Sequence, residues 1–339
     1  MRFPLSLTRS MTAYLLKQRL GGRTHFPLVL MLEPLHACNL ACTGCGRIRE
    51  YADTFQSRMS MDECLASVDE CPAPVVSICG GEPLVYEGVE ELVRRTVARP
   101  RHVYLCTNGL LLEQKLDGFR PSSRLFINVH LDGLEATHDR AVGRPGVFAR
   151  AVAGIKAAKA AGFLVTTNTT VYHETDMREV VVLLEYLAEL GVDGFMLSPS
   201  FGYEAVFQSQ PDRAQSLFMT RDEIREKFRK IRPRLKRFRL VTSPIYLDFL
   251  CGRRELECAA WANPTRNVRG WKGPCYLVTD RHYASYRELV EATAWDRLGP
   301  GKDPRCEHCL VHCGFEPAAV LAAHRRWRDA LTMALWQLG

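Results

Sequence analysis

Between residues 28 and 200 the chain alternates short apolar stretches with longer amphipathic ones, and this alternation constrains the fold more than any other feature. The apolar stretches have the length and β-branched content of buried strands, and several segments after them carry apolar residues at helical spacing. A capping box at Ser60 and Glu63 predicts one helix start. The alternation predicts strands at 28–32, 74–79, 102–106, 125–131, 163–171 and 192–198, and helices at 87–98, 147–161 and 177–190.

Repeated strand–helix units favour a parallel sheet with helices outside it. The six strands predict an α/β fold, a partial (β/α)6 barrel whose chemistry lies where the strands end. After residue 200 the pattern breaks: residues 200–245 are basic and irregular, 246–317 are rich in cysteine, and 318–339 are predicted to form one helix. We therefore expect an amphipathic segment at 1–27, the barrel at 28–240 and a cysteine-rich region at 241–339.

The composition narrows the class of protein. The 339 residues include 13 cysteines, an odd and clustered set that is more typical of metal ligands than of disulfides. No uninterrupted apolar run has the length of a membrane span or a signal peptide, so we expect a cytoplasmic protein. The net charge of +7 includes no basic block of the kind that binds nucleic acid, so no nucleic-acid partner is expected.

The first cysteine motif follows the first predicted strand, with Cys38, Cys42 and Cys45 spaced C-x3-C-x2-C. Three thiolates on a tight loop hold three irons of a [4Fe–4S] cluster and leave the fourth open to the amino and carboxylate groups of S-adenosylmethionine (SAM). A zinc site completed by His36 is the alternative. The position of the motif in a six-fold strand–helix repeat favours the cluster.

With that motif in this place, residues 28–200 resemble the radical SAM superfamily, whose members reduce SAM to a 5′-deoxyadenosyl radical. The resemblance implies that SAM is bound where the second to fifth strands end. The residues implied are Gly80, Gly81 and Glu82 of a Gly-Gly-Glu-Pro turn, Asn108 of Thr-Asn-Gly, His130 and Asp132 of Asn-Val-His-Leu-Asp-Gly, and Asn168 of Asn-Thr-Thr. Gly44 is a departure, because this family usually has an aromatic residue before its third cysteine.

These residues have different expected roles. The two glycines let backbone approach the methionyl group closely, and Glu82 accepts a hydrogen bond from the SAM amine. His130 stands where a serine usually contacts the ribose. A histidine satisfied within the fold is the alternative for His130, and an ordinary threonine-rich strand is the alternative for Asn168.

A second cysteine set resembles the SPASM/twitch extension that follows many radical SAM barrels. It consists of Cys258, Cys275, Cys306, Cys309 and Cys313, with Gly270 between the first two. Five thiols suffice for one auxiliary [4Fe–4S] cluster with one to spare. Zinc held with His308 or His312 is the alternative.

Longer stretches, among them PLVLMLEPLHACNLACTGCG, NPTRNVRGWKGPCYL and CEHCLVHCGFEP, resemble the adenosyl-hopene transferase family of hopanoid biosynthesis. The resemblance implies that the adenosyl radical adds to the terminal alkene of diploptene to give adenosylhopane, with flavodoxin or ferredoxin as electron donor. The resulting carbon radical needs a hydrogen atom. Cys106, at the end of the third strand, is the candidate donor; Cys79 and an electron from the auxiliary cluster are the alternatives.

Two other functions remain open at this point. A SPASM-type enzyme would abstract hydrogen from a peptide or small molecule and release 5′-deoxyadenosine, and an iron–sulfur sensor would turn over no SAM. The chain ends are basic and carry apolar residues such as Leu5, Leu16, Trp327 and Leu331. We expect them to contact the inner membrane peripherally, unless both helices simply pack on the barrel.

Overall fold

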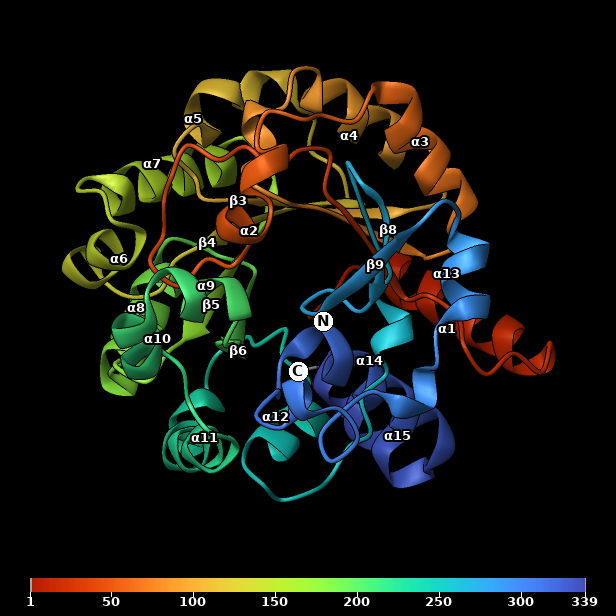
Figure 1. Ribbon diagram of the computed structural model, residues 1–339. Helices are drawn as coiled ribbons and strands as arrows, with labels where there is room; N and C mark the ends of the chain where they lie inside the picture. Colours follow the sequence, from red (N-terminus) through yellow and green to blue (C-terminus); the bar gives the residue numbers. More distant parts are fainter. Residues whose placement is uncertain (1, 339) are drawn as a thin grey trace.

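The computed structural model describes residues 2–338, except for the side chain of residue 324 (Figure 1). Within these residues nine strands form one sheet, in the order β6-β5-β4-β3-β2-β1-β7-β8-β9. Neighbouring strands from β1 to β6 are parallel, which confirms the α/β fold and the six-stranded partial barrel. The six strands are β1 (Val29–Leu32), β2 (Val75–Ile78), β3 (His102–Thr107), β4 (Leu125–His130), β5 (Leu164–Val171) and β6 (Gly194–Pro199).

Helices cover the outside of these strands (Figure 1). Side chains such as Val76, Val103 and Ile127 point outward and form the main core with them. Helix α3 begins at the expected capping box, where the Glu63 amide donates to Ser60 Oγ (3.2 Å) and the Ser60 amide to Glu63 Oε2 (2.7 Å). The helices of this half are α2 (Arg47–Glu50), α3 (Met61–Glu70), α4 (Val89–Val97), α5 (Leu112–Lys115), α6 (Glu135–Val142), α7 (Val147–Ala160) and α8 (Met177–Glu189).

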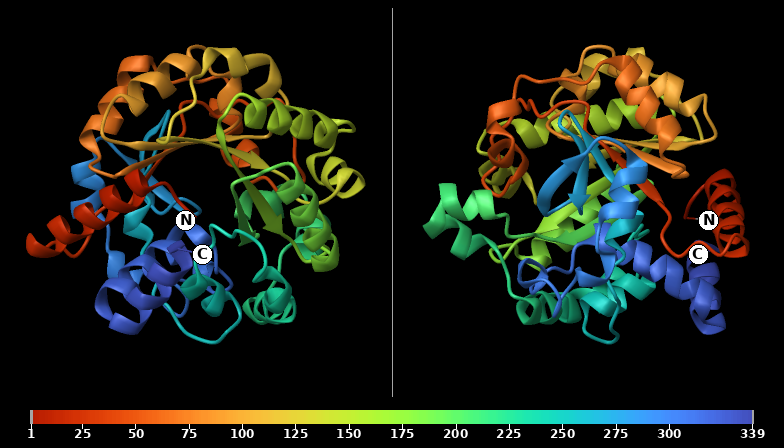
Figure 2. Two further views of the ribbon diagram at one scale, coloured as in Figure 1. Left: turned by 180° about the vertical axis from the view of Figure 1, so that it is seen from behind. Right: turned by 45° about the vertical axis from the view of Figure 1, so that its right-hand side comes forward.

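Alternate side chains of the strands face the barrel interior. Near the strand starts, Val75 and Phe126 pack on Leu7 of α1 (Leu5–Leu20), so this helix closes the barrel at the end opposite the cysteine loop. The first and last described segments of the chain lie side by side next to it (Figure 2). There the Arg2 amide donates to the Gln337 carbonyl at 2.9 Å. Met1 and Gly339 lie outside the described residues.

The cysteine-rich region continues the barrel sheet. Strand β7 (Thr265–Asn267) runs parallel to β1, with Met31 opposite Thr265, and antiparallel strands β8 (Gly270–Pro274) and β9 (Thr279–Tyr283) follow it. The division of the chain at residue 240 therefore stays a prediction.

Residues 200–245 differ from the expected irregular segment, because they are mostly helical. In α11, Ile224, Phe228, Ile231 and Leu235 are buried at helical spacing among many arginines and lysines that conceal the pattern in the sequence. The expected single C-terminal helix is two helices that meet at Arg326. The helices of this half are α9 (Glu204–Ser209), α10 (Pro211–Leu217), α11 (Arg221–Leu235), α12 (Pro244–Leu250), α13 (Tyr286–Ala292), α14 (His312–Arg325) and α15 (Trp327–Leu338).

Candidate functional site

The first cysteine motif lies on the loop between β1 and α2, at the carboxyl edge of the barrel. The three thiols interact on this loop: burial raises the pKa of the Cys42 thiol, and Cys45 and Cys38 raise it further. Arg49 fixes the loop: its Nη1 donates to the carbonyl oxygens of Cys42 (3.1 Å) and Cys45 (2.5 Å). The structure thus brings together all three predicted ligands.

His36, the candidate fourth ligand of a zinc site, is engaged elsewhere. Its Nδ1 lies 3.0 Å from Thr54 Oγ1, and its ring stacks on Tyr51 with centroids 4.0 Å apart. Its Nε2 faces the Glu33 carboxylate at 3.9 Å. These contacts hold the imidazole within the protein core rather than among the thiols.

The Gly-Gly-Glu-Pro turn packs directly on the backbone that leads into the cysteine loop. Gly80 has a φ of +108°, and a Cβ at Gly81 would lie 2.0 Å from the Ala37 carbonyl oxygen. The Glu82 amide donates to that same oxygen at 2.9 Å. The glycines are therefore needed for the approach of two protein segments. Their contact with the methionyl group of SAM stays a prediction.

Glu82 is buried and links β2 to β3. Its carboxylate accepts hydrogen bonds from Thr107 Oγ1 (2.7 Å), the Asn108 amide (2.8 Å) and the Leu84 amide (3.0 Å). Burial raises the pKa of Glu82, and these three donors oppose the rise. Asn108 in turn donates from Nδ2 to Asn39 Oδ1 at 2.8 Å and faces Cys38 Sγ at 4.0 Å. Glu82 and Asn108 thus connect the ends of β2 and β3, against which the cysteine loop lies.

The residues at the ends of β4 and β5 form one connected group. His130 Nε2 lies 2.9 Å from Asp132 Oδ2, and His130 Nδ1 lies 3.4 Å from Asn168 Nδ2. Burial lowers the pKa of His130, but the Asp132 carboxylate raises it by more. Asn168 Oδ1 is buried without a hydrogen-bond partner. A free acceptor at this edge fits a hydroxyl donor such as a ribose.

Cys106 lies inside the barrel, on β3. Its Sγ is 3.3 Å from Ser77 Oγ on β2, and Asn128 on β4 donates to it from Nδ2 at 3.6 Å. Thr166 Oγ1 donates to Asn128 Oδ1 at 2.9 Å, which orients the amide nitrogen toward the sulfur. Burial raises the pKa of the Cys106 thiol, so the protonated form is favoured at neutral pH. The rival donor Cys79 is also buried, and its pKa is raised.

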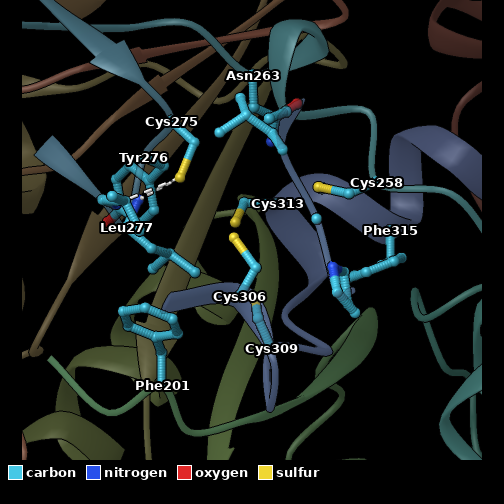
Figure 3. Close-up of a pocket in the computed structure, with 16 residues that line it drawn as sticks. Phe201, Cys258, Asn263, Cys275, Tyr276, Leu277, Cys306, Cys309, Cys313 and Phe315 are labelled. Atoms are coloured by element: carbon cyan, nitrogen blue, oxygen red, sulfur yellow. Dashed lines mark hydrogen bonds between the residues drawn. The ribbon is translucent and has the colours of Figure 1, made fainter. Parts of the chain in front are cut away.

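The second cysteine set lines a single pocket (Figure 3). All five candidate ligands contribute to it: Cys258, Cys275, Cys306, Cys309 and Cys313. The Leu277 and Val278 amides both donate to Cys275 Sγ at 3.3 Å, as amides do around iron–sulfur clusters. A Cβ at Gly314 would lie 2.4 Å from Cys258 Sγ, so only glycine leaves that sulfur its place.

Neither histidine proposed for a zinc site lines this pocket. His312 Nδ1 bonds Ser198 Oγ at 2.8 Å, and His308 is exposed. Within the described part of the chain, no group of three or more His, Cys, Asp and Glu side chains is gathered closely enough for one metal ion. The pocket is thus walled by thiols and by apolar side chains such as Phe201 and Leu277.

Three further residues contribute to these sites, although the sequence pattern does not predict them. A Cβ at Gly44 would lie 2.6 Å from the Tyr172 ring, so this tyrosine from the end of β5 packs where the usual aromatic residue is missing. A Cβ at Gly46 would lie 2.1 Å from the Tyr203 ring. Arg47 is buried, follows Cys45 by two residues and interacts electrostatically with Cys313 of the second set. No local sequence pattern signals these contacts, because each joins distant segments.

Comparisons with known proteins agree with this geometry. Residues 32–187 match the family described as Radical SAM superfamily, and residues 195–333 match one described as Domain of unknown function (DUF3463). An AdoMet-dependent heme synthase of Methanosarcina barkeri is 32% identical over 173 residues, 50% of this chain and 49% of that protein. A GTP 3′,8-cyclase of Mycobacterium tuberculosis is 33% identical over 168 residues, 46% of this chain and 47% of that protein. The chain thus spans about half the length of these curated relatives.

A solved structure shares the fold over most of the chain. The crystal structure of Streptococcus suis SuiB bound to precursor peptide SuiA has a TM-score of 0.62 at 15% identity, covering 88% of this chain and 73% of that one. Three clustered thiols, a free acceptor at the neighbouring strand ends and a thiol-walled pocket fit a [4Fe–4S] cluster with SAM and an auxiliary cluster. Residues 32–187, just under half of the chain, match the radical SAM superfamily, and a [4Fe–4S] cluster with SAM is the cofactor set of that family.

Proposed function

We propose that the chain adds the 5′-deoxyadenosyl group of SAM to the terminal alkene of a triterpene, diploptene, to give adenosylhopane. The observation that carries this proposal is the position of the Cys106 thiol inside the barrel, between Ser77 and Asn128. A reaction that joins adenosine to an alkene ends with a carbon radical and needs a hydrogen-atom donor. An enzyme that only abstracts hydrogen needs none there.

A bound [4Fe–4S] cluster would supply the electron that cleaves SAM to methionine and the adenosyl radical. Cys38, Cys42 and Cys45 would hold the cluster, and His130, Asp132 and Asn168 would orient the ribose. In this proposal these residues would keep the adenosyl carbon at the mouth of the barrel, near Cys106.

The bonds, electrons and protons of the later steps balance. Addition forms one C–C bond, breaks the π bond of the alkene and leaves a tertiary carbon radical. The Cys106 S–H bond then breaks, a C–H bond forms, and a thiyl radical remains on the sulfur. One electron from a flavodoxin- or ferredoxin-type donor and one proton return the thiol. Asn128 supports this role because its amide donates to the sulfur and so helps to hold the thiol in place.

We expect Cys106→Ala to retain SAM cleavage while the saturated adduct falls at least about tenfold, because the variant lacks the hydrogen-atom donor that the proposal places beside the product radical. Product analysis by mass spectrometry and NMR measures the fall and detects alkene or epimeric adducts. Cys64→Ala is the matched control, since Cys64 is buried on the outside of the barrel. An unchanged adduct with unchanged stereochemistry would exclude Cys106 as the donor.

A second candidate function is hydrogen abstraction from a peptide or small molecule with release of 5′-deoxyadenosine. The peptide-bound structural neighbour favours it, since its fold covers most of this chain. Anaerobic incubation with SAM, a reductant and diploptene separates the two functions. An adenosylated lipid supports the transferase, whereas free 5′-deoxyadenosine with unmodified diploptene supports abstraction. No SAM turnover would point to a sensor.

We further propose that α15 contacts an anionic membrane surface. No helix within residues 2–338 combines the length and apolar character needed to cross a bilayer. Asp329 and Gln337 tie one side of α15 to Arg254 and Phe3. Its other side presents an outward apolar stripe, each residue at least 52% exposed: Trp327, Leu331, Leu335 and Leu338. Exposed Arg325, Arg326 and Arg328 lie beside the stripe and complement anionic headgroups.

We expect Leu331→Glu/Leu335→Glu to weaken co-sedimentation with vesicles of phosphatidylglycerol and phosphatidylethanolamine at least about tenfold, because two apolar side chains lose their burial in lipid. Val182→Glu is the matched control, an exposed apolar residue on α8. Equal binding of the double variant and the wild type would contradict the membrane contact. A dimer that the double variant disrupts would assign the stripe to a second copy instead.

A further inference from the structure

A single buried arginine connects the two cysteine sets. Arg47 stands two residues after Cys45 and begins α2. Its Nη2 donates to the Tyr276 carbonyl at 2.7 Å, and its guanidinium carbon lies 4.1 Å from the centroid of the Tyr276 ring. Tyr276 directly follows Cys275. One side chain thus joins the loop of the catalytic thiols to the turn of the auxiliary thiols.

A second buried cation strengthens this connection. Lys272, on β8, is 1% exposed and donates from Nζ to the same Tyr276 carbonyl at 3.0 Å. It also contacts both oxygens of Glu50, at 3.3 and 3.4 Å, and Thr279 hydrogen-bonds that carboxylate. Because Glu50 ends α2, the helix after the first motif is fixed to the hairpin that carries Cys275.

The positively charged side chain of Arg47 forms a buried ion pair with Glu33. Its Nε lies 2.9 Å from Glu33 Oε1, and Glu33 is completely buried. Burial alone lowers the pKa of Arg47, but Glu33 and the surrounding tyrosines together raise it well above its usual value. A permanent charge in a water-poor interior acts over longer distances than one at the surface. The guanidinium and the Glu33 carboxylate carry opposite charges, so removing one or the other is expected to change the field at the neighbouring thiols in opposite directions.

Tyr203 forms a further bridge. Its ring lies against Gly46, beside Cys45, and it packs in one apolar cluster with Val311 and Cys313 of the auxiliary pocket. The Cys45 loop and the auxiliary pocket are therefore connected through the packed side chain of Tyr203.

We infer that Arg47 is a positioning residue for both iron–sulfur sites: it fixes the Cys45 loop against the Cys275 turn, and its charge raises the reduction potential of both clusters. A nearby cation favours the reduced cluster, because reduction adds negative charge. The inference rests on the proposed pair of clusters and goes beyond the proposed reaction, since it holds for either substrate class.

The test compares the clusters of purified wild-type protein with those of Arg47→Met, Glu33→Gln and Arg47→Lys. Anaerobic redox titration followed by electron paramagnetic resonance gives each midpoint potential, and iron analysis gives the cluster content. We expect Arg47→Met to shift both potentials down and Glu33→Gln to shift both up, while Arg47→Lys stays near the wild type. A purely structural role would not give shifts of opposite sign.

Arg47→Met leaves Glu33 buried without its partner, which endangers folding. The double variant Arg47→Met/Glu33→Gln removes both charges, and its potentials should return toward those of the wild type. Two clusters with unshifted potentials, or shifts of one sign in both single variants, would overturn the inference alone. A wild-type protein with about four irons rather than about eight would overturn the auxiliary cluster and the inference with it.

Discussion

Cys42→Ala is expected to abolish SAM cleavage and to lower bound iron by about four atoms per chain. Two thiolates cannot hold the cubane with its open iron, and nothing nearby replaces the third. His36, the nearest sequence candidate, is stacked on Tyr51 and faces Thr54 and Glu33. The measurement is iron content and 5′-deoxyadenosine formation in anaerobically reconstituted protein.

Two controls make this result specific. Cys71→Ala removes another buried thiol without touching the loop, and it should retain iron and turnover. The auxiliary iron should also remain in Cys42→Ala, because the second pocket shares no ligand with the first. Wild-type turnover by Cys42→Ala would refute the assignment of the catalytic cluster.

The parts of the fold set by local pattern were predictable from sequence. The six parallel strands follow short apolar runs, and α3 begins at the Ser60 capping box. The location of the candidate SAM site was also predictable from the sequence. Parallel strands end on one side of the sheet, and this brings His130 near Asn168. The predicted strand ends indicate where His130, Asp132 and Asn168 lie, but the sequence does not predict the hydrogen bonds between them.

Other features depend on contacts between distant segments. The helical character of α11 was masked by its charges, although Thr220 and Glu223 form a capping box there. Tyr172 on Gly44 and Arg47 on Tyr276 join segments more than a hundred residues apart. No periodicity encodes such pairs, so only the folded chain identifies them as parts of the site.

The second large effect concerns the auxiliary pocket. We expect Gly314→Val to lower bound iron from about eight to about four atoms per chain, while the catalytic cluster persists. The cause is steric: a Cβ at this position would lie 2.4 Å from Cys258 Sγ, and valine adds two methyl groups. Because Gly314 does not have a positive φ, backbone strain is not the reason for the effect. Iron analysis with electron paramagnetic resonance distinguishes the remaining cluster.

Comparison with Cys258→Ala shows whether the glycine acts through that sulfur. If Cys258 is a ligand, each variant loses the same iron, and combining them removes no more, because both changes disable one contact. Cys251→Ala is the control, since this buried thiol at the end of α12 lies outside the pocket. Full iron in both single variants would make Cys258 the spare thiol of the five and leave Cys275, Cys306, Cys309 and Cys313 as the ligands. Loss of iron in Gly314→Val alone would instead assign the glycine to the packing of α14 against the pocket, independent of Cys258.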